Sequence, residues 1–422
     1  MGLKIEKIKG EYPVYDIKVK DNENFYANDI LVHNCIEIMQ STNETTTAIC
    51  TLSSMILKNF FKGKKFDFDL LYNEVRKVVK ALNKVIDINS YSTSKGKKGG
   101  FEQRAIAIGV QGFADLVYMM DLIFTGKEAR LLNKQIAETI YYAAVTESME
   151  LCKSGEYKSY DYFEGSPMQK GIFQFDMWGL TEVDLSGMWD WNSLKAAVAQ
   201  YGICNSLFVA YMPTASSAKI SGSYESFEPM DSNLFNRRVV GGEFLIVNKY
   251  LISDLEEFNM WNEQIKNEII INNGSIQNIN FQKYIDVESK NYEKKIKRIE
   301  HLISKYKTVW EIPQKELIEM SAERSPFIDQ SQSLNIYMAN PTVGKISSSI
   351  MFAWKKGLKT GSYYLRTKAI STGAKHLAID VSNKSLNSIS DEEIDLKNKI
   401  DEENAKNIKS NNSEFDCFGC SS

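Results

Sequence analysis

Residues 31–37 read Leu-Val-His-Asn-Cys-Ile-Glu, and this stretch joins two parts of the chain with different sequence patterns. Before it, residues 1–34 form short alternating apolar runs separated by turn residues, which predicts β-structure. After it, residues 35–380 combine long helical stripes with short apolar runs, which predicts an α/β domain. The two patterns meet at a thiol, Cys35.

Composition limits the classes of function. The chain has 422 residues, 43% apolar and 25% charged, with a net charge of −3, so no nucleic-acid partner is expected. No apolar run approaches about 18 residues and no secretory signal opens the chain, so no membrane association is expected. Six cysteines are few for this length, which disfavours a disulfide framework. The sequence therefore predicts a cytoplasmic protein.

The first 34 residues are too few to bury a core alone, so they require a partner or a host. They resemble the C-terminal fragment of a split intein in Val-Tyr-Asp-Ile at 14–17 and in the run from Asn24 to Cys35. In such a reaction the Asn34 side chain attacks its own backbone carbonyl and breaks the bond that follows. His33 moves protons near neutral pH, and the Cys35 thiol accepts an acyl group.

One position departs from the intein pattern, because Glu23 stands where a second histidine is usual. The alternative is that this segment is an ordinary β-hairpin that ends in His-Asn-Cys by chance. A further alternative is that residues 1–34 stay attached and act as a docking module for an upstream half.

Residues 35–380 alternate helices with buried strands. Apolar residues recur at helical spacing over Phe66–Asn89 and Gly126–Cys152, which predicts two long helices. Short apolar runs at Ile203–Met212 and Leu334–Met338 predict buried parallel strands. This order is typical of an α/β barrel or a doubly wound sheet.

Eight stretches of this part resemble the large, catalytic subunit of class I ribonucleotide reductase, in family order. They are residues 35–38, 48–53, 108–112, 212–217, 225–229, 236–244, 327–335 and 357–367. The resemblance implies the C-terminal part of a ten-stranded α/β barrel. It also implies that an upstream half carries the nucleotide effector sites and a second reductant cysteine.

Cys35 and Glu37 are two residues apart, so an extended backbone points both side chains to one side. By resemblance, Cys35 is the thiyl radical that removes the ribose 3′-hydrogen, and Glu37 accepts the proton of the 3′-hydroxyl. Cys50 corresponds to one of two reductant thiols. Cys152 and Cys204 fall on no thiol position of the family and are predicted to be packing residues.

Two further sites follow from the resemblance. The loop after the 203–212 run is expected to hold the substrate diphosphate through Pro213, Thr214, Ala215, Ser216 and Ser217. Small hydroxyl residues and backbone N–H groups after a strand suit a phosphate. The adjacent aromatic pair Tyr363 and Tyr364 is expected to relay a radical from a small, dimetal-containing subunit, so this chain itself is expected to bind no metal.

The last two segments are polar. Residues 285–305 are rich in charge and predict an extended surface helix of no assigned function. Residues 381–422 predict a disordered tail that ends in Cys417 and Cys420. A Cys-x-x-Cys pair without further ligands favours redox chemistry over zinc. By resemblance it re-reduces the active site and is itself reduced by thioredoxin or glutaredoxin.

The sequence therefore predicts three segments: an intein fragment at 1–34, a reductase barrel at 35–380 and a redox tail at 381–422. After trans-splicing the product is expected to reduce ribonucleoside diphosphates as a homodimeric large subunit.

Overall fold

The computed structural model describes residues 24–27, 30–33, 36–239, 242–285 and 292–368, with only the backbone placed in 24–33 and 235–245. The described residues belong to two units, and each is described by itself. The first contributes a hairpin in which β1 (Asn24–Ala27) pairs antiparallel with β2 (Ile30–His33). The rest of the predicted intein segment, including Glu23, lies outside the described residues, and so does the predicted tail at 381–422.

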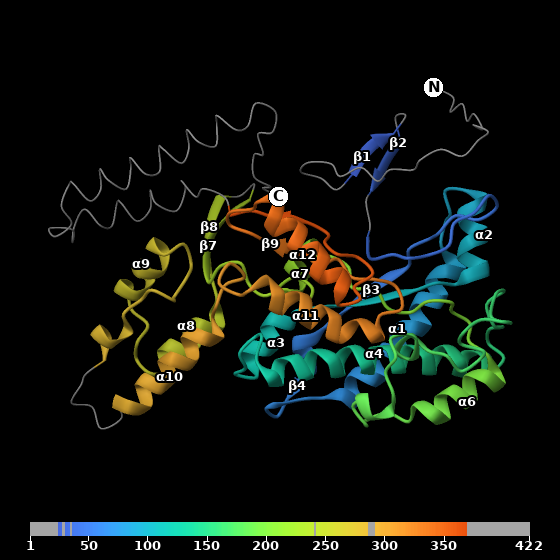
Figure 1. The fold of residues 1–422 in the computed structure, drawn as a ribbon, viewed down its shortest axis with the longest axis horizontal. Helices are drawn as coiled ribbons and strands as arrows, with labels where there is room; N and C mark the ends of the chain where they lie inside the picture. The colour runs from blue at the N-terminus through green and yellow to red at the C-terminus, as the bar shows by residue number, and fades with distance from the viewer. Residues whose placement is uncertain (1–23, 28–29, 34–35, 240–241, 286–291, 369–422) are drawn as a thin grey trace. The chain divides into compact units, whose positions relative to one another are not determined.

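Parallel strands form the centre of the second unit (Figure 1). Strand β3 (Leu52–Ile56) pairs with β6 (Ala107–Gln111) along its whole length. Single bridges then join Ile108 to Val209 and Tyr211 to Gln332, both parallel. The 203–212 run thus joins the sheet by bridges rather than as a regular strand. Further along, β9 (Ile336–Tyr337) and β10 (Leu365–Arg366) form another parallel pair.

Two long helices confirm the helical stripes in the sequence. Helix α1 (Phe68–Ile88) begins where the Asp67 carboxylate accepts a hydrogen bond from Leu70 N at 2.8 Å. Helix α4 (Lys127–Lys153) begins after Gly126. The two helices pack against each other, because α1 carries a buried stripe at Leu71, Val75, Val79, Leu82 and Ile86.

The remaining elements connect and cover these strands. Before β6 lie η1 (Leu57–Phe60), β4 (Phe61–Lys62), β5 (Lys65–Phe66) and α2 (Ser94–Gln103). After β6 come α3 (Phe113–Met119), α5 (Gln174–Met177), η2 (Glu182–Asp184), α6 (Trp191–Tyr201), α7 (Ala215–Ser221), β7 (Leu234–Val239), β8 (Gly242–Val247), α8 (Lys249–Glu257), α9 (Glu263–Ile271), η3 (Phe281–Tyr284), α10 (Tyr292–Lys305), α11 (Gln314–Arg324), η4 (Ser325–Phe327) and α12 (Val343–Lys355). Within the described ranges, no helix combines the length and apolar character that a membrane span requires.

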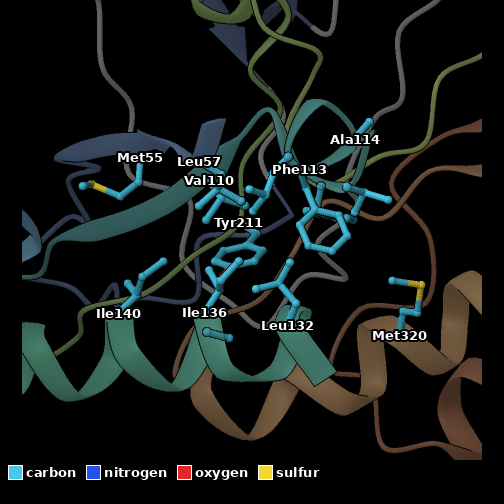
Figure 2. Packing of buried hydrophobic residues seen from close by; sticks show 14 of the residues in the cluster. Met55, Leu57, Val110, Phe113, Ala114, Leu132, Ile136, Ile140, Tyr211 and Met320 are labelled. Atoms are coloured by element: carbon cyan, nitrogen blue, oxygen red, sulfur yellow. The ribbon is translucent and has the colours of Figure 1, made fainter. Parts of the chain in front are cut away.

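The core lies between the strands and α4 (Figure 2). Met55, Val110 and Tyr211 from the strand segments belong to the same buried cluster as Ile136 and Ile140 on the helix, and all five are at most 6% exposed (Figure 2). Burial of each large apolar side chain stabilises the fold by about 1.5–3 kcal/mol. This packing fixes which face of the strands is turned away from α4.

The charged segment at 285–305 is only partly the surface helix that its sequence predicts. Helix α10 lies beside α8 (Figure 1), and its Leu302 is buried. Lys305 is 2% exposed, with Nζ 2.8 Å from Asp121 Oδ1 and 2.6 Å from Asp254 Oδ2. The prediction of a surface helix did not anticipate that Lys305, on one face of α10, is buried and paired with Asp121 and Asp254.

Candidate active site

The face of the strands turned away from α4 carries small and polar side chains, and we call it the inner face. Ala107, Ala210 and Met212 form a separate apolar cluster there, and Ile38 packs on it. A Cβ added at Gly109 would lie 2.9 Å from the Ala210 carbonyl oxygen, so glycine permits this close approach of two strands. The segment that begins at residue 36 therefore runs across the inner face.

Glu37 is fixed by two contacts to the segment 331–333, which meets Tyr211 through the bridge at Gln332. Its backbone oxygen accepts a hydrogen bond from Ser331 N at 2.9 Å, and its Oε2 accepts one from Ser333 Oγ at 2.6 Å. The side chain is only 3% exposed. A buried carboxylate that is held by a hydroxyl donor keeps one orientation, which suits a proton acceptor. Cys35 and Asn34 lie outside the described residues, and of His33 only the backbone is placed.

The segment that carries Ser331 and Ser333 is braced at its start by a buried carboxylate. Asp329 accepts hydrogen bonds from Phe208 N and Val209 N, both at 2.8 Å. Burial raises the pKa of Asp329 to about 6, although these N–H groups and the nearby Lys359 ammonium oppose the rise. These two hydrogen bonds hold Asp329 beside residues 208 and 209. They therefore also fix the position of Ser331 and Ser333, which bind Glu37.

The predicted phosphate loop follows Met212 and contains one buried residue and three exposed ones. Thr214 is buried, and its Oγ1 accepts a hydrogen bond from Ser226 N at 2.7 Å, so its hydroxyl serves the loop itself. Ala215 and Ser216 are exposed at the start of α7, while Pro213 is half-buried. Ser217 is exposed too, and its Oγ donates to Gln111 Oε1 at 3.0 Å. Residues 215–217 are therefore the exposed part of the predicted loop.

The rings of the two predicted relay tyrosines are in contact, and both residues are bonded to the segment that leads into β9. The ring centroids of Tyr363 and Tyr364 are 4.1 Å apart with the planes tilted by 40°. Tyr363 N donates to the Leu334 oxygen at 2.7 Å, and Ile336 N donates to the Tyr364 oxygen at 2.8 Å. Leu334 directly follows Ser333, so the tyrosine pair is joined to the strand that orients Glu37.

Cys50 is exposed and lies two residues before β3. Its neighbour Thr51 accepts a backbone hydrogen bond from Ala107 N at 2.9 Å, which ties this end of β3 to β6. Cys417 and Cys420 lie outside the described residues. The structure thus connects Glu37 with Tyr363 through one strand and places Cys50 at the start of another.

The chain matches a known protein family over most of its length. The sequence model of the family described as "Ribonucleotide reductase, barrel domain" matches residues 11–364. The chain belongs to this family. The match confirms the barrel fold expected from the sequence. It begins inside the predicted intein segment, so it gives no boundary at residue 35.

Relatives of this ribonucleotide reductase barrel are large chains of ribonucleoside-diphosphate reductase. The one from Schizosaccharomyces pombe is 44% identical over 360 residues, which is 85% of this chain and 42% of the relative. The large subunit from Danio rerio is 43% identical over 395 residues, 92% of this chain and 46% of the relative. The chain therefore spans less than half the length of these relatives.

A solved structure shares the fold of the reductase barrel. The Actinobacillus ureae class Id ribonucleotide reductase alpha subunit superposes with a TM-score of 0.56 at 22% identity. The superposition covers 79% of this chain and 52% of the other. At this identity the likeness concerns the fold alone.

Sequence reasoning missed part of the site of this reductase barrel. Ser331 and Ser333 lay within a stretch noted only for its resemblance, although hydroxyl residues at positions i and i+2 of a strand do indicate a polar face. Glu228 was also missed. It is buried, and it accepts hydrogen bonds from Asn335 Nδ2 and Tyr337 Oη. Burial raises its pKa to about 7, although Tyr337 and Arg366 oppose the rise.

Proposed function

We propose that this chain, once joined to an upstream half, forms the catalytic subunit of a class I ribonucleoside-diphosphate reductase. The reaction converts ribonucleoside diphosphates to their 2′-deoxy forms. The observation that carries the proposal is the buried Glu37 carboxylate, which Ser333 holds on the inner face of a reductase barrel. The names of the relatives support the same activity.

The chemistry assigned to the inner face has two parts. The Cys35 thiyl radical removes the 3′-hydrogen of the ribose, and Glu37 accepts the proton of the 3′-hydroxyl, which eases the loss of water from C2′. Ser333 donates to Oε2 at 2.6 Å and so orients the carboxylate for this transfer. Cys50 and a second thiol from the upstream half then supply two electrons and form a disulfide.

The remaining predicted residues serve this reaction. The exposed residues 215–217 at the start of α7 suit the diphosphate, while Thr214 shapes the loop through Ser226. Tyr363 and Tyr364, with centroids 4.1 Å apart, are the proposed radical relay from a dimetal-containing small subunit. Cys417 and Cys420 are the proposed pair that re-reduces the site and receives electrons from thioredoxin or glutaredoxin.

We assign the first segment to protein splicing. Asn34 cyclisation, assisted by His33, would release residues 1–34, and Cys35 would become the first residue of the joined segment. The thiol that splicing needs is then the thiol that the reductase needs, so no foreign residue remains. The mature large subunit is proposed to be a homodimer whose effector nucleotides bind in the upstream half.

The deciding experiment is intact-mass analysis after this chain is mixed with an upstream half that carries its own intein fragment. We expect a ligated product whose second part begins at Cys35, and we expect Asn34→Ala to abolish it. Reductase turnover of the ligated product, compared with that of a Cys35→Ser product, then tests the activity. If both chains keep their starting masses while they co-elute, residues 1–34 are a docking module instead.

A further inference from the structure

Two cysteines lie side by side on the far side of the strands from the proposed chemistry. Cys152 is in the last turn of α4, and Cys204 lies between α6 and the strand segment that bridges to β6. Their side chains interact with each other, and each affects the pKa of the other. Neither is part of a disulfide, and the function proposed above uses neither.

Helix geometry explains why the two thiols meet. Ser148 and Cys152 are four residues apart, so they share one face of α4. Ser148 Oγ lies 3.4 Å from Cys204 Sγ and accepts a hydrogen bond from Asn205 N at 3.0 Å. The helix face that carries Cys152 is therefore fastened directly to the backbone beside Cys204.

The environment makes the two sulfurs unequal. Cys204 is fully buried, whereas Cys152 is partly exposed, so the pair borders solvent on one side only. The pKa of the Cys204 thiol is lowered, first by the hydrogen bond from Cys152, and further by Ser148 and the Arg104 guanidinium. The hydrogen bond to Cys204 and burial raise the pKa of Cys152. The Cys204 thiol also donates a hydrogen bond to Asn205 Oδ1 at 3.2 Å, which fixes the position of its sulfur.

We propose that Cys152 and Cys204 are a peroxide-sensitive dithiol that closes reversibly to a disulfide. Hydrogen peroxide oxidises one thiol to a sulfenic acid and releases one water. The second sulfur attacks the sulfenic sulfur, the S–S bond forms, and the second water leaves. Two thiols and one peroxide thus give one disulfide and two waters, so peroxide receives both electrons.

The disulfide would clamp the end of α4 to the segment that leads into the loop at 213–217. It closes a loop of about 50 residues, which restricts the unfolded chain. We therefore expect oxidation to raise the melting temperature by about 5 °C, since a disulfide of this loop length acts on a domain of several hundred residues. Reduction should reverse the shift.

The test is peptide mapping of the full chain. Reduced protein is treated with hydrogen peroxide, alkylated under denaturing conditions and digested with trypsin. We expect one linked species that joins peptide 135–153, which contains Cys152, to peptide 196–219, which contains Cys204. Dithiothreitol should separate it, and Cys152→Ser should abolish both the linked species and the melting shift.

The inference is overturned if both thiols are alkylated separately in a sample in which the exposed Cys50 has been oxidised. It is equally overturned if either sulfur is found linked only to Cys35 or Cys50. If Cys152→Ser does not fold, the wild-type map alone decides, because it identifies the linked peptides directly. Splicing and reductase activity are not needed for this readout, so it is independent of the proposed function.

Discussion

The two faces of the parallel strands differ although alternate residues of the same segments build them. The face toward α4 carries Met55, Val110 and Tyr211, which pack on Ile136 and Ile140. The inner face carries Ser54, Ala107, Gly109 and Ala210, followed by the strand with Ser331 and Ser333. One face carries large apolar side chains that are densely packed. The other carries mainly small residues, together with serine hydroxyls.

The residues that stabilise the core and those proposed for the chemistry therefore lie on opposite faces, one position apart along each segment. Apolar burial against α4 supplies much of the favourable free energy of folding, so the inner face is free to place a carboxylate and hydroxyls where a substrate would bind. Because side chains alternate along a strand, a shift of one residue in register would exchange the two faces. The comparison predicts different consequences for substitutions on each side.

The largest expected effect is on the inner face. Glu37→Gln keeps the size of the side chain and an acceptor for Ser333 but removes the proton-accepting carboxylate. We expect reductase turnover of the ligated product to fall by about 10²- to 10⁴-fold, the usual contribution of a general base. The melting temperature should stay unchanged. Glu44→Gln at an exposed position is the control, and equal turnover in the two variants would contradict the role of Glu37.

On the face toward α4, Ile140→Ala should act on stability alone. Ile140 is fully buried, so the truncation leaves a cavity and should lower the free energy of unfolding by about 2–5 kcal/mol. Urea denaturation followed by circular dichroism measures this. Leu131→Ala on the same helix, where Leu131 is 55% exposed, should change it by less than about 0.5 kcal/mol. A similar cost at both positions would show that this face does not carry the core.

A third test concerns Glu228, the buried carboxylate that accepts hydrogen bonds from Asn335 and Tyr337. Burial raises its pKa from 4.5 to about 7, so the folded state binds its proton more tightly than the unfolded state. Its contribution to stability is fully present below pH 4.5 and is lost as the pH rises through about 7. The wild type should therefore lose about 3 kcal/mol relative to Glu228→Gln over this range.

Urea titrations of both proteins at pH 4.5, 6 and 7.5 check this. Glu164→Gln at an exposed position should follow the wild type at every pH. A constant stability difference between Glu228→Gln and the wild type would mean that Glu228 is ionised in the fold throughout.

The smallest expected effect is that of Ser333→Ala. It removes the hydroxyl that donates to Glu37 at 2.6 Å, and hydrogen bonds to charged groups contribute about 1.5–3 kcal/mol. We expect turnover to fall by about tenfold, because the carboxylate loses the donor that orients it. Ser331→Ala is the matched control, since Ser331 reaches Glu37 through its backbone N–H and its Oγ contacts Thr360. Equal turnover of the two variants would show that the Ser333 hydroxyl does not position Glu37.

The sequence by itself determined the helices, the family and the candidate residues. Helical spacing gave the two long helices to within two residues, because a buried stripe needs a fixed period. The order of the eight motifs along the chain indicated the reductase barrel, since each motif is a run of consecutive residues. Local patterns of this kind are written in neighbouring residues, so no three-dimensional information is needed to read them.

Only the tertiary structure decided which distant residues meet. Ser333 reaches Glu37 across 296 positions of sequence, and Asp329 braces Phe208 across 121. The contact between Cys152 and Cys204 also depends on how α4 packs, and each cysteine by itself predicted only packing. Such pairs carry no local signal, because burial and strand order arise from the whole fold. The sequence therefore indicated which side chains are candidates for the chemistry, and the packing of the strands decided which of them lie in contact.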